Sequence, residues 1–128
     1  IKKRSEQILK DVSTIMVENP EMDVQLNGHA DEIGTIPYND KLSSKRAKQA
    51  KQFLIGRGIS PKRIKTKAFG ELHPVAMNKD EFGRDLPEGR QFNRRVEIVI
   101  ASKEDDIRNL VLTSQVLNIP LWLRLRKE

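Results

Sequence analysis

The sequence predicts an α+β fold, an α/β sandwich in which helices pack on a mixed β-sheet. Two kinds of segment follow one another along the chain. In one kind the apolar residues are spaced three and four apart, as in a helix, and in the other apolar and polar residues alternate, as in a strand. Their order is helix, strand, helix, strand, loop and strand, which places helices against a sheet. The 128 residues, 37% of them hydrophobic, suit one domain with one core.

The first half of the chain supplies two helices and two strands. Residues 2–18 have the apolar spacing of a helix and stop before Pro20. Residues 22–30 alternate as a strand. Residues 39–57 form a second amphipathic helix that glycines end, and residues 63–70 alternate as a second strand.

The second half of the chain is less regular. A long loop rich in glycine and proline follows the second strand, and residues 95–101, with VEIVI at their centre, predict a third strand. Ser102 and Asp105 have the spacing of a helix start, so a short helix is expected over 102–111. Leucine alternates with tryptophan and arginine over 121–126, which favours a strand.

The composition indicates an anionic partner. The formal net charge is +6 and the pI is near 9.7, which favours nucleic acid, a membrane surface or another polyanion. Without cysteine the chain forms no disulfide, thiolate metal site or cysteine nucleophile. No apolar run approaches the roughly 20 residues of a membrane span, and the first residues lack the pattern of a signal peptide. We therefore expect either a cytosolic chain or the mature part of an exported protein.

One residue of the second helix does not fit the helix's apolar face. Leu42, Ala50 and Phe53 fall on one side of the helical wheel at about 100° per residue. Arg46 falls among them, about 40° from Leu42. Because a buried guanidinium without a partner is costly, Arg46 reaches solvent from the edge of this face, pairs with a structural carboxylate, or faces a bound anion.

The loop GHADEIG, residues 28–34, leads into this helix and carries a candidate partner for Arg46. Asp31 lies in the loop, so its carboxylate can approach the first half of the helix. A carboxylate and a guanidinium on one wall are complementary to a zwitterion, of which a free amino-acid centre is the simplest.

Several motifs follow one another in the order found in one protein family: GHADEIG, Tyr38-Asn39, LSSKRA, RIKTKAFGELHP, Asn78 and GRQFNRRVEI. From about residue 5 to residue 101 the chain resembles the OmpA-like C-terminal domain, the peptidoglycan-binding module of Gram-negative outer-membrane proteins, lipoproteins and flagellar stators. The resemblance implies non-covalent binding of the peptidoglycan stem peptide without catalysis. It also implies a periplasmic domain that parts outside this chain connect to the outer membrane or to an envelope assembly. We expect residues 1–101 to form this domain, and residues 102–128 to pack on it as an extension with a short helix and a possible strand.

The resemblance also implies which residues bind. Asp31 and Arg46 match the positions that hold the free amino and carboxylate groups of meso-diaminopimelate. Two more residues, Arg94 and Asn39, match positions that line the family's pocket. The remaining candidates for the peptidoglycan site are Ala30 and Asn78.

Three features depart from the family pattern. Ala30 stands where the family commonly has threonine, so a hydroxyl beside Asp31 is missing. The loop from Asn78 to Gly89 is longer than usual, and forms either a lid or a bulge into solvent. The family's domain opens with a strand before its first helix, and this sequence starts at the helix. Residues 119–127 are one candidate for a replacement strand and a neighbouring chain is another, or the strand is missing from this sequence.

The same residues leave a metal site and an acid–base site open as alternatives. His29, Asp31, Glu32 and His73 include the two histidines and the carboxylate of a zinc site, but their spacing is not diagnostic. Asp31 and Glu32 are neighbours on an extended chain and face apart, which disfavours a shared catalytic role. We expect structural histidines, and no metal, cofactor or catalysis.

Nucleic-acid binding is the alternative function. Arg84, Arg90, Arg94, Arg95 and the lysine-rich outer face of the second helix are suited to phosphate contacts. Against it, aromatic residues make up only 5% of the chain and form no stacking array. The basic residues are also spread over many segments, which favours the function that the family resemblance implies.

Overall fold

The computed structural model describes residues 3–102, 105–113, 121–123 and 125. The helices and strands of these residues are α1 (Lys3–Glu18), β1 (Met22–Gly28), α2 (Ile36–Gly56), β2 (Ile64–Ala68), α3 (Pro87–Asn93), β3 (Val96–Ser102) and β4 (Asp105–Thr113). Single turns of 3₁₀ helix lie at η1 (Pro61–Arg63) and η2 (Leu121–Leu123).

The described strands form one mixed sheet in the order β2-β1-β3-β4. β1 and β2 run parallel, and β3 runs antiparallel to both β1 and β4. The register places Val24 beside Ile64 and Ile100, and Leu26 beside Ile98. The predicted fold class, helices packed on a mixed sheet, is confirmed.

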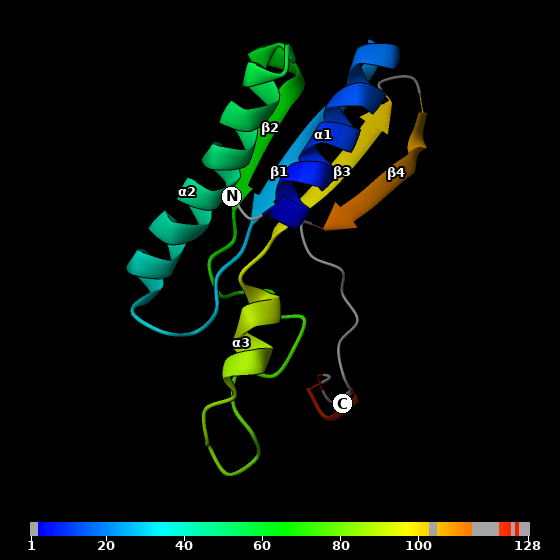
Figure 1. Ribbon diagram of the computed structural model, residues 1–128. Helices are drawn as coiled ribbons and strands as arrows, with labels where there is room; N and C mark the ends of the chain where they lie inside the picture. Colours follow the sequence, from blue (N-terminus) through cyan, green and yellow to red (C-terminus); the bar gives the residue numbers. More distant parts are fainter. Residues whose placement is uncertain (1–2, 103–104, 114–120, 124, 126–128) are drawn as a thin grey trace.

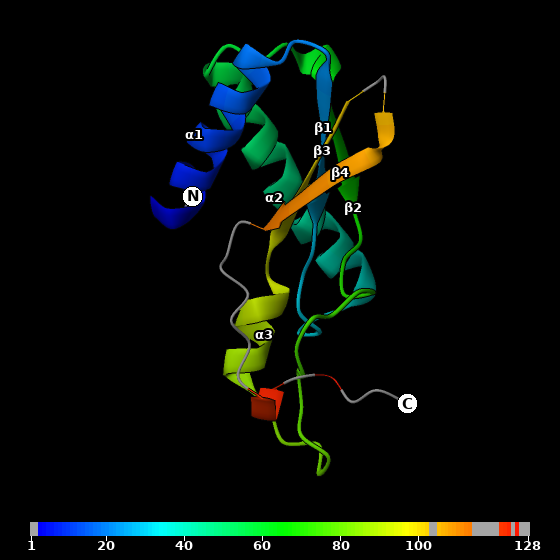
Figure 2. The ribbon, with the colours of Figure 1, turned by 90° about the vertical axis from the view of Figure 1, so that its right-hand side faces the viewer.

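Helices α1 and α2 cover the face of the sheet that carries these apolar residues. The buried side chains that the two helices contribute to the core are Leu9, Val12, Met16, Ala47, Ala50 and Leu54. They follow the spacing of three and four on which the helix predictions rest. The two helices lie against the same side of the sheet (Figures 1 and 2). On β2 the opposite face of the sheet carries Lys65 and Lys67, which are exposed.

One end of the sheet gathers the loops that carry the candidate site. At this end β1 and β2 finish, β3 begins, and α3 lies beyond them (Figures 1 and 2). His29 N donates to Arg95 O at 2.8 Å, and Ala30 N donates to Gly70 O at 2.7 Å. The first bond joins the segment after β1 to the residue before β3, and the second joins it to the segment after β2. The carboxyl ends of parallel strands are a common place for ligand sites in sheets that helices cover.

Gly28, the last residue of β1, lets α2 approach this end of the sheet closely. A Cβ atom on Gly28 would lie only 1.9 Å from Ser43 O, so any side chain there would push α2 away. Ser43 Oγ is buried, accepts a hydrogen bond from Gly70 N at 3.0 Å and donates one to Asp40 O at 2.9 Å. The first half of α2 is thereby fixed over the end of the sheet.

Two helix boundaries in the structure differ from the predicted ones, because proline can start a helix as well as end one. α2 begins at Ile36 rather than at residue 39, since Thr35 Oγ1 caps the helix by accepting from Tyr38 N at 3.2 Å and Pro37 fits the first turn. The loop expected after β2 ends in a helix, α3, which Pro87 opens in the same way.

The short helix expected over 102–111 is wrong. Residues 105–113 form β4, which pairs with β3 and places Leu110 opposite Ile100 and Leu112 opposite Ile98. The outer edge of β3 would otherwise leave its backbone groups unpaired, and the alternating leucines of this segment fit a strand as well as a helix.

The replacement strand expected within residues 119–127 is also wrong where the structure describes it. Leu121–Leu123 form η2, which lies beside α3 and away from the sheet (Figure 2). β4 is instead the strand at the β3 edge. Residues 119–120, 124 and 126–127 of that prediction lie outside the described residues. In the part of the chain that is described, no helix is both long and apolar enough to cross a membrane.

Candidate functional site

Asp31 is a buried carboxylate just beyond the end of β1. Its side chain is 9% exposed. Oδ1 accepts a hydrogen bond from Ile33 N at 2.9 Å, and Oδ2 accepts one from Arg94 Nη1 at 2.7 Å. Arg90 Nη1 lies 3.6 Å from the same Oδ2. Because a carboxylate oxygen accepts two hydrogen bonds, Asp31 retains room for a further donor.

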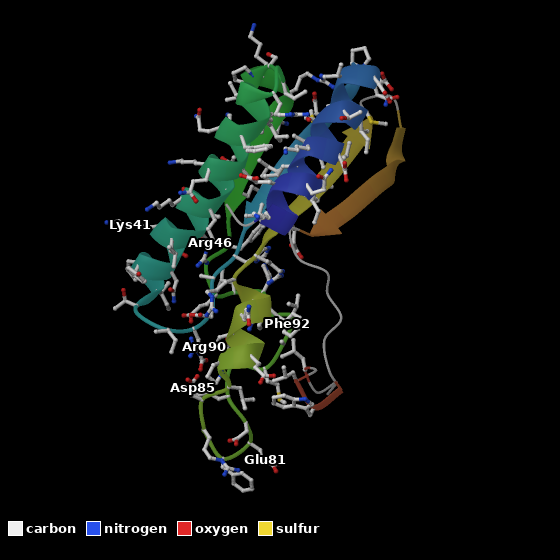
Figure 3. All side chains as sticks on the ribbon, in the orientation of Figure 1. Lys41, Arg46, Glu81, Asp85, Arg90 and Phe92 are labelled. Atoms are coloured by element: carbon white, nitrogen blue, oxygen red, sulfur yellow. The ribbon has the colours of Figure 1, made fainter. Side chains whose placement is uncertain are left out.

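Arg46 is a half-buried cation on α2. Its Nη1 donates to His29 O at 2.9 Å, and it lies on the inner side of α2 while Lys41 points outward (Figure 3). Within the described residues no carboxylate lies within 4.0 Å of its guanidinium. Burial and the charge of Arg94 lower the pKa of Arg46, and the charge of Asp31 opposes them. Its unused donors are therefore suited to an anion from outside the chain.

Arg95 provides a contrast within the same molecule. Only 2% of this residue is exposed, and its Nη2 donates to Glu97 Oε2 at 3.2 Å and to His73 O at 2.9 Å. Burial lowers the pKa of Arg95, and the charge of Glu97 raises it. The buried arginine with a structural role thus has its own carboxylate. The structural carboxylate considered for Arg46 is not found among the described residues.

Two arginines one turn apart face Asp31: Arg90 in α3, and Arg94, which follows the last residue of the helix. Arg94 bonds directly to Asp31, whereas Arg90 bridges Asp31 and Asp85. The guanidinium of Arg90 donates to both oxygens of Asp85, from Nε to Oδ1 at 2.8 Å and from Nη2 to Oδ2 at 2.9 Å (Figure 3). The sequence prediction placed Arg94 in the pocket but Arg90 only among possible phosphate contacts. Their four-residue spacing indicates a shared face once α3 is known to be a helix.

The cluster has more positive than negative charge. The guanidinium groups of Arg46, Arg90 and Arg94 outnumber the carboxylates of Asp31 and Asp85 by one. Asp31 forms its ion pair with Arg94 rather than with Arg46, the partner expected from the helical wheel. Asp31, a carboxylate that two arginines share, therefore lies at the same end of the sheet as Arg46, which has no carboxylate within 4.0 Å among the described residues.

Asn39 lies two turns before Arg46 on the same face of α2. It is 1% exposed, and neither its amide nitrogen nor its amide oxygen has a hydrogen-bond partner among the described residues. Leaving a buried polar group unpaired costs about 1–3 kcal/mol, so such a group indicates a place for a water molecule or a ligand. This is the position that the family resemblance assigns to the pocket wall.

Asn78 and Ala30, the other candidate residues, have backbone-supporting contacts. Asn78 Oδ1 accepts from Asn93 Nδ2 at 2.9 Å. Asn93 is fully buried and also bonds Ala76, accepting from its N at 3.1 Å and donating to its O at 3.0 Å. Ala30 is buried and its N–H bonds Gly70 O. Asn93 was not predicted, because its partners lie far away in the sequence.

His29 belongs to a polar and aromatic cluster at the same end of the sheet. Its Nε2 lies 2.7 Å from Glu97 Oε1, and its ring stacks on Phe69 with centroids 5.3 Å apart. His73 meets the ring edge-on at 6.3 Å. Burial is the main cause that lowers the pKa of His29, followed by the charge of Arg95. Within the described residues, no three histidines, cysteines or acidic residues are grouped so as to hold a metal ion.

Comparison with known proteins decides the family. The sequence model of the OmpA family matches residues 1–85. The chain belongs to the OmpA family. The resemblance seen in the motifs is therefore confirmed.

Two curated relatives show how far the family likeness extends. The chain is 49% identical over 73 residues to outer membrane protein A of Bordetella avium, covering 57% of this chain and 34% of that protein. It is 37% identical over 94 residues to the peptidoglycan-binding protein ArfA of Mycobacterium bovis, covering 73% of this chain and 27% of that protein. The chain thus spans about a third or less of the length of these relatives.

A solved structure of the OmpA family supports the fold. The chain is similar to the peptidoglycan-associated lipoprotein from Burkholderia pseudomallei, with a TM-score of 0.68 and 25% sequence identity. The similarity covers 79% of this chain and 80% of that chain. By their names, these relatives are outer-membrane, lipoprotein or binding proteins.

Proposed function

We propose that this chain binds peptidoglycan without catalysis, through the diaminopimelate of the stem peptide. Membership of the OmpA family supports the proposal, as do relatives whose names describe peptidoglycan binding or association. We place the chain in the periplasm, where it would attach a parent envelope or outer-membrane protein to the cell wall.

The observation that carries the proposal is the contrast between two arginines. Arg95 is buried against Glu97, whereas Arg46 has no carboxylate within salt-bridge distance among the described residues. A ligand carboxylate would supply the missing counter-ion, and the planar guanidinium can bind both of its oxygens. The proposal thus gives a physical reason for a half-buried cation that the fold itself does not neutralise.

Asp31 and Asn39 would complete the recognition of the ligand. The remaining lone pairs of Asp31 accept hydrogen bonds from the ammonium group that lies beside the carboxylate in diaminopimelate. The amide of Asn39, unpartnered within the described residues, supplies a donor and an acceptor from the same face of α2 as Arg46. Hydrogen bonds to charged groups contribute about 1.5–3 kcal/mol each, so removing either charge should weaken binding about tenfold or more.

Co-sedimentation with purified sacculi tests the proposal. Wild-type protein should pellet with diaminopimelate sacculi, whereas Asp31→Ala and Arg46→Ala should remain largely in the supernatant. Lys48→Ala is the matched control, because it removes an exposed cation from the outer side of the same helix. Sacculi with lysine in place of diaminopimelate lack the side-chain carboxylate, so they should retain less wild-type protein. Normal pelleting of folded Asp31→Ala and Arg46→Ala would show that the site is elsewhere.

Nucleic-acid binding is the alternative function, and a separate measurement tests it. A hollow of ≈ 720 Å³ on the outer side of α2 is lined by residues that include Lys41, Lys45, Lys48 and Phe53. If this surface bound a nucleic acid, affinity for DNA would fall steeply with salt and with Lys48→Ala, but not with Arg46→Ala. Fluorescence anisotropy at two salt concentrations separates this outcome from peptidoglycan binding.

A further inference from the structure

The long loop before α3 forms an ordered projection, here named the finger and defined as residues 79–85. Lys79 and Asp85 pair across its base as an antiparallel bridge. The chain reverses at Gly83, whose φ of 79° is open to glycine but rare for other residues. The finger extends away from the sheet beyond α3, and Glu81 lies near its tip (Figure 3).

Asp80 holds the finger in one shape. Its Oδ1 accepts hydrogen bonds from Phe82 N and Arg84 N, each at 2.9 Å, and its Oδ2 accepts one from Arg84 Nε at 2.7 Å. The backbone adds a bond from Asp80 N to Arg84 O at 2.9 Å. A surface loop that is ordered in this way loses little entropy when it binds a ligand.

Phe82 is presented to solvent at the tip of the finger. The residue is 74% exposed, the most exposed of the large hydrophobic residues described. The guanidinium of Arg84 lies over its ring, 5.2 Å from the centroid. One face of the ring therefore has a protein partner, and the high exposure leaves apolar ring surface for a ligand.

The finger is joined to the proposed stem-peptide site on two sides. Asp85 at its base binds Arg90, which lies beside Asp31. Lys79 lies 3.5 Å from Glu32, the residue that follows Asp31. A change in the position of the finger would therefore shift the side chains around Asp31. A ligand bound at Asp31 would also lie beside the finger.

The distance from the site to the tip, estimated from chain geometry, is comparable to the length of a stem peptide. One turn of α3 and three extended residues of the finger add to roughly 15 Å. An extended peptide of three or four residues spans about 10–14 Å. A stem peptide with its diaminopimelate at Asp31 thus spans most of the way to the tip, so the sugar attached to its end comes within reach of the finger.

The charges of the finger favour a neutral ligand over a polyanion. Lys79 is paired with Glu32, Asp80 with Arg84, and Asp85 with Arg90. What the tip offers is an aromatic ring beside guanidinium N–H groups. The C–H face of a sugar ring packs on an aromatic face, and its hydroxyl and acetamido oxygens accept hydrogen bonds.

We propose that the finger is a second subsite, at which Phe82 and Arg84 bind a sugar of the glycan strand whose stem peptide occupies the Asp31 and Arg46 site. This inference rests on the proposed function and extends it from the peptide to the glycan. The subsite makes the chain prefer a stem peptide that is still attached to sugar over the same peptide alone.

Calorimetry with two soluble ligands tests the subsite. One ligand is the diaminopimelate stem peptide, and the other is that peptide attached to its disaccharide. Wild-type protein should bind the disaccharide peptide about three- to tenfold more tightly. Phe82→Ala should abolish this preference and leave the affinity for the free peptide unchanged, while Phe82→Trp should preserve it. Trp122→Ala is the control, because it removes another exposed aromatic residue, 55% exposed and outside the finger.

The two proposals fail in different ways. Equal affinity of the wild-type protein for both ligands, or a preference that survives Phe82→Ala, would overturn the subsite and leave the stem-peptide site standing. Failure of the wild-type protein to bind either ligand would overturn the proposed function. Asp31→Ala should weaken binding of both ligands, because both share the stem peptide.

Discussion

Replacing Arg46 and Arg95 separately by methionine should distinguish a binding residue from a structural one. Methionine keeps much of the apolar stem and removes the charge. Arg46 donates one hydrogen bond, to His29 O, and has no carboxylate within 4.0 Å in the described structure. Its removal costs about 1 kcal/mol for that bond and relieves the desolvation of a half-buried cation, so the net change in unfolding free energy should stay within about 1 kcal/mol.

Arg95→Met should be far more destabilising. It leaves Oε2 of Glu97 and the carbonyl oxygen of His73 without the donor that the buried guanidinium supplies, while Oε1 of Glu97 keeps its contact with His29. Removing one partner of a buried ion pair costs about 3–5 kcal/mol. In a domain of this size, 1 kcal/mol corresponds to about 3–5 °C in Tm, so Arg95→Met should lower Tm by about 10–20 °C and Arg46→Met by less than about 5 °C.

Urea denaturation followed by circular dichroism measures both variants, and sacculus co-sedimentation at 20 °C measures binding. We expect Arg46→Met to keep its stability and lose binding. If Arg46→Met were as destabilised as Arg95→Met, Arg46 would be a structural residue. The interpretation of its missing counter-ion as a ligand requirement would then be wrong.

Two further predictions concern the supports of the site. His29 has a lowered pKa because it is buried, so its protonation should not change the unfolding free energy above about pH 7. As pH falls through about 6.5 the unfolded chain takes up the proton first, and unfolding free energy should decrease until the folded pKa is reached. Urea titrations at pH 7.5 and 5.5 should show a smaller difference for His29→Gln than for wild type; an equal or larger difference would contradict this. Leu123 is fully buried, its carbonyl accepts from Met77 N at 2.8 Å, and a Cβ on Gly89 would lie 3.4 Å from its side chain. Leu123→Ala should therefore lower the unfolding free energy by about 2–3 kcal/mol and weaken stem-peptide binding through α3. Leu123→Met should keep both stability, measured by thermal melting, and affinity, measured by calorimetry. Unchanged binding by Leu123→Ala would show that η2 does not support the site.

The first two helices and the first two strands could be predicted because their signals are local. Periodic apolar residues identify the elements, and proline or glycine ends them. The same local signals failed at α3 and β4. Pro87 fits a loop and the first turn of a helix equally well, and the apolar residues of 105–113 fit both periods. The unpaired edge of β3 decides between helix and strand for 105–113, and that edge is not visible in the segment itself.

The candidate site was predictable to the extent that it breaks a local pattern. Arg46 stands out because it interrupts an apolar face, and Asp31 because it lies in a polar loop at the end of a strand. Their neighbours depend on pairs distant in the chain. Arg94 meets Asp31 across 63 positions, and Arg90 reaches the same carboxylate only because α3 folds back on the loop. No periodicity encodes such contacts.

The physical pattern of the site is a set of polar groups that lack partners in the described part of the chain, next to buried side chains that are hydrogen-bonded. Around it, Asn93 and Arg95 have hydrogen-bond partners for their side chains. Within it, Asn39 has an unpaired buried amide and Arg46 lacks a carboxylate, both among the described residues. Folding alone does not favour these two choices, since apolar residues at both positions would remove a desolvation cost. Residues that lower stability, within surroundings that stabilise the fold, are typical of binding sites. The unmet groups face the same end of the sheet from one helix, so one ligand with a carboxylate and nearby polar groups can satisfy both.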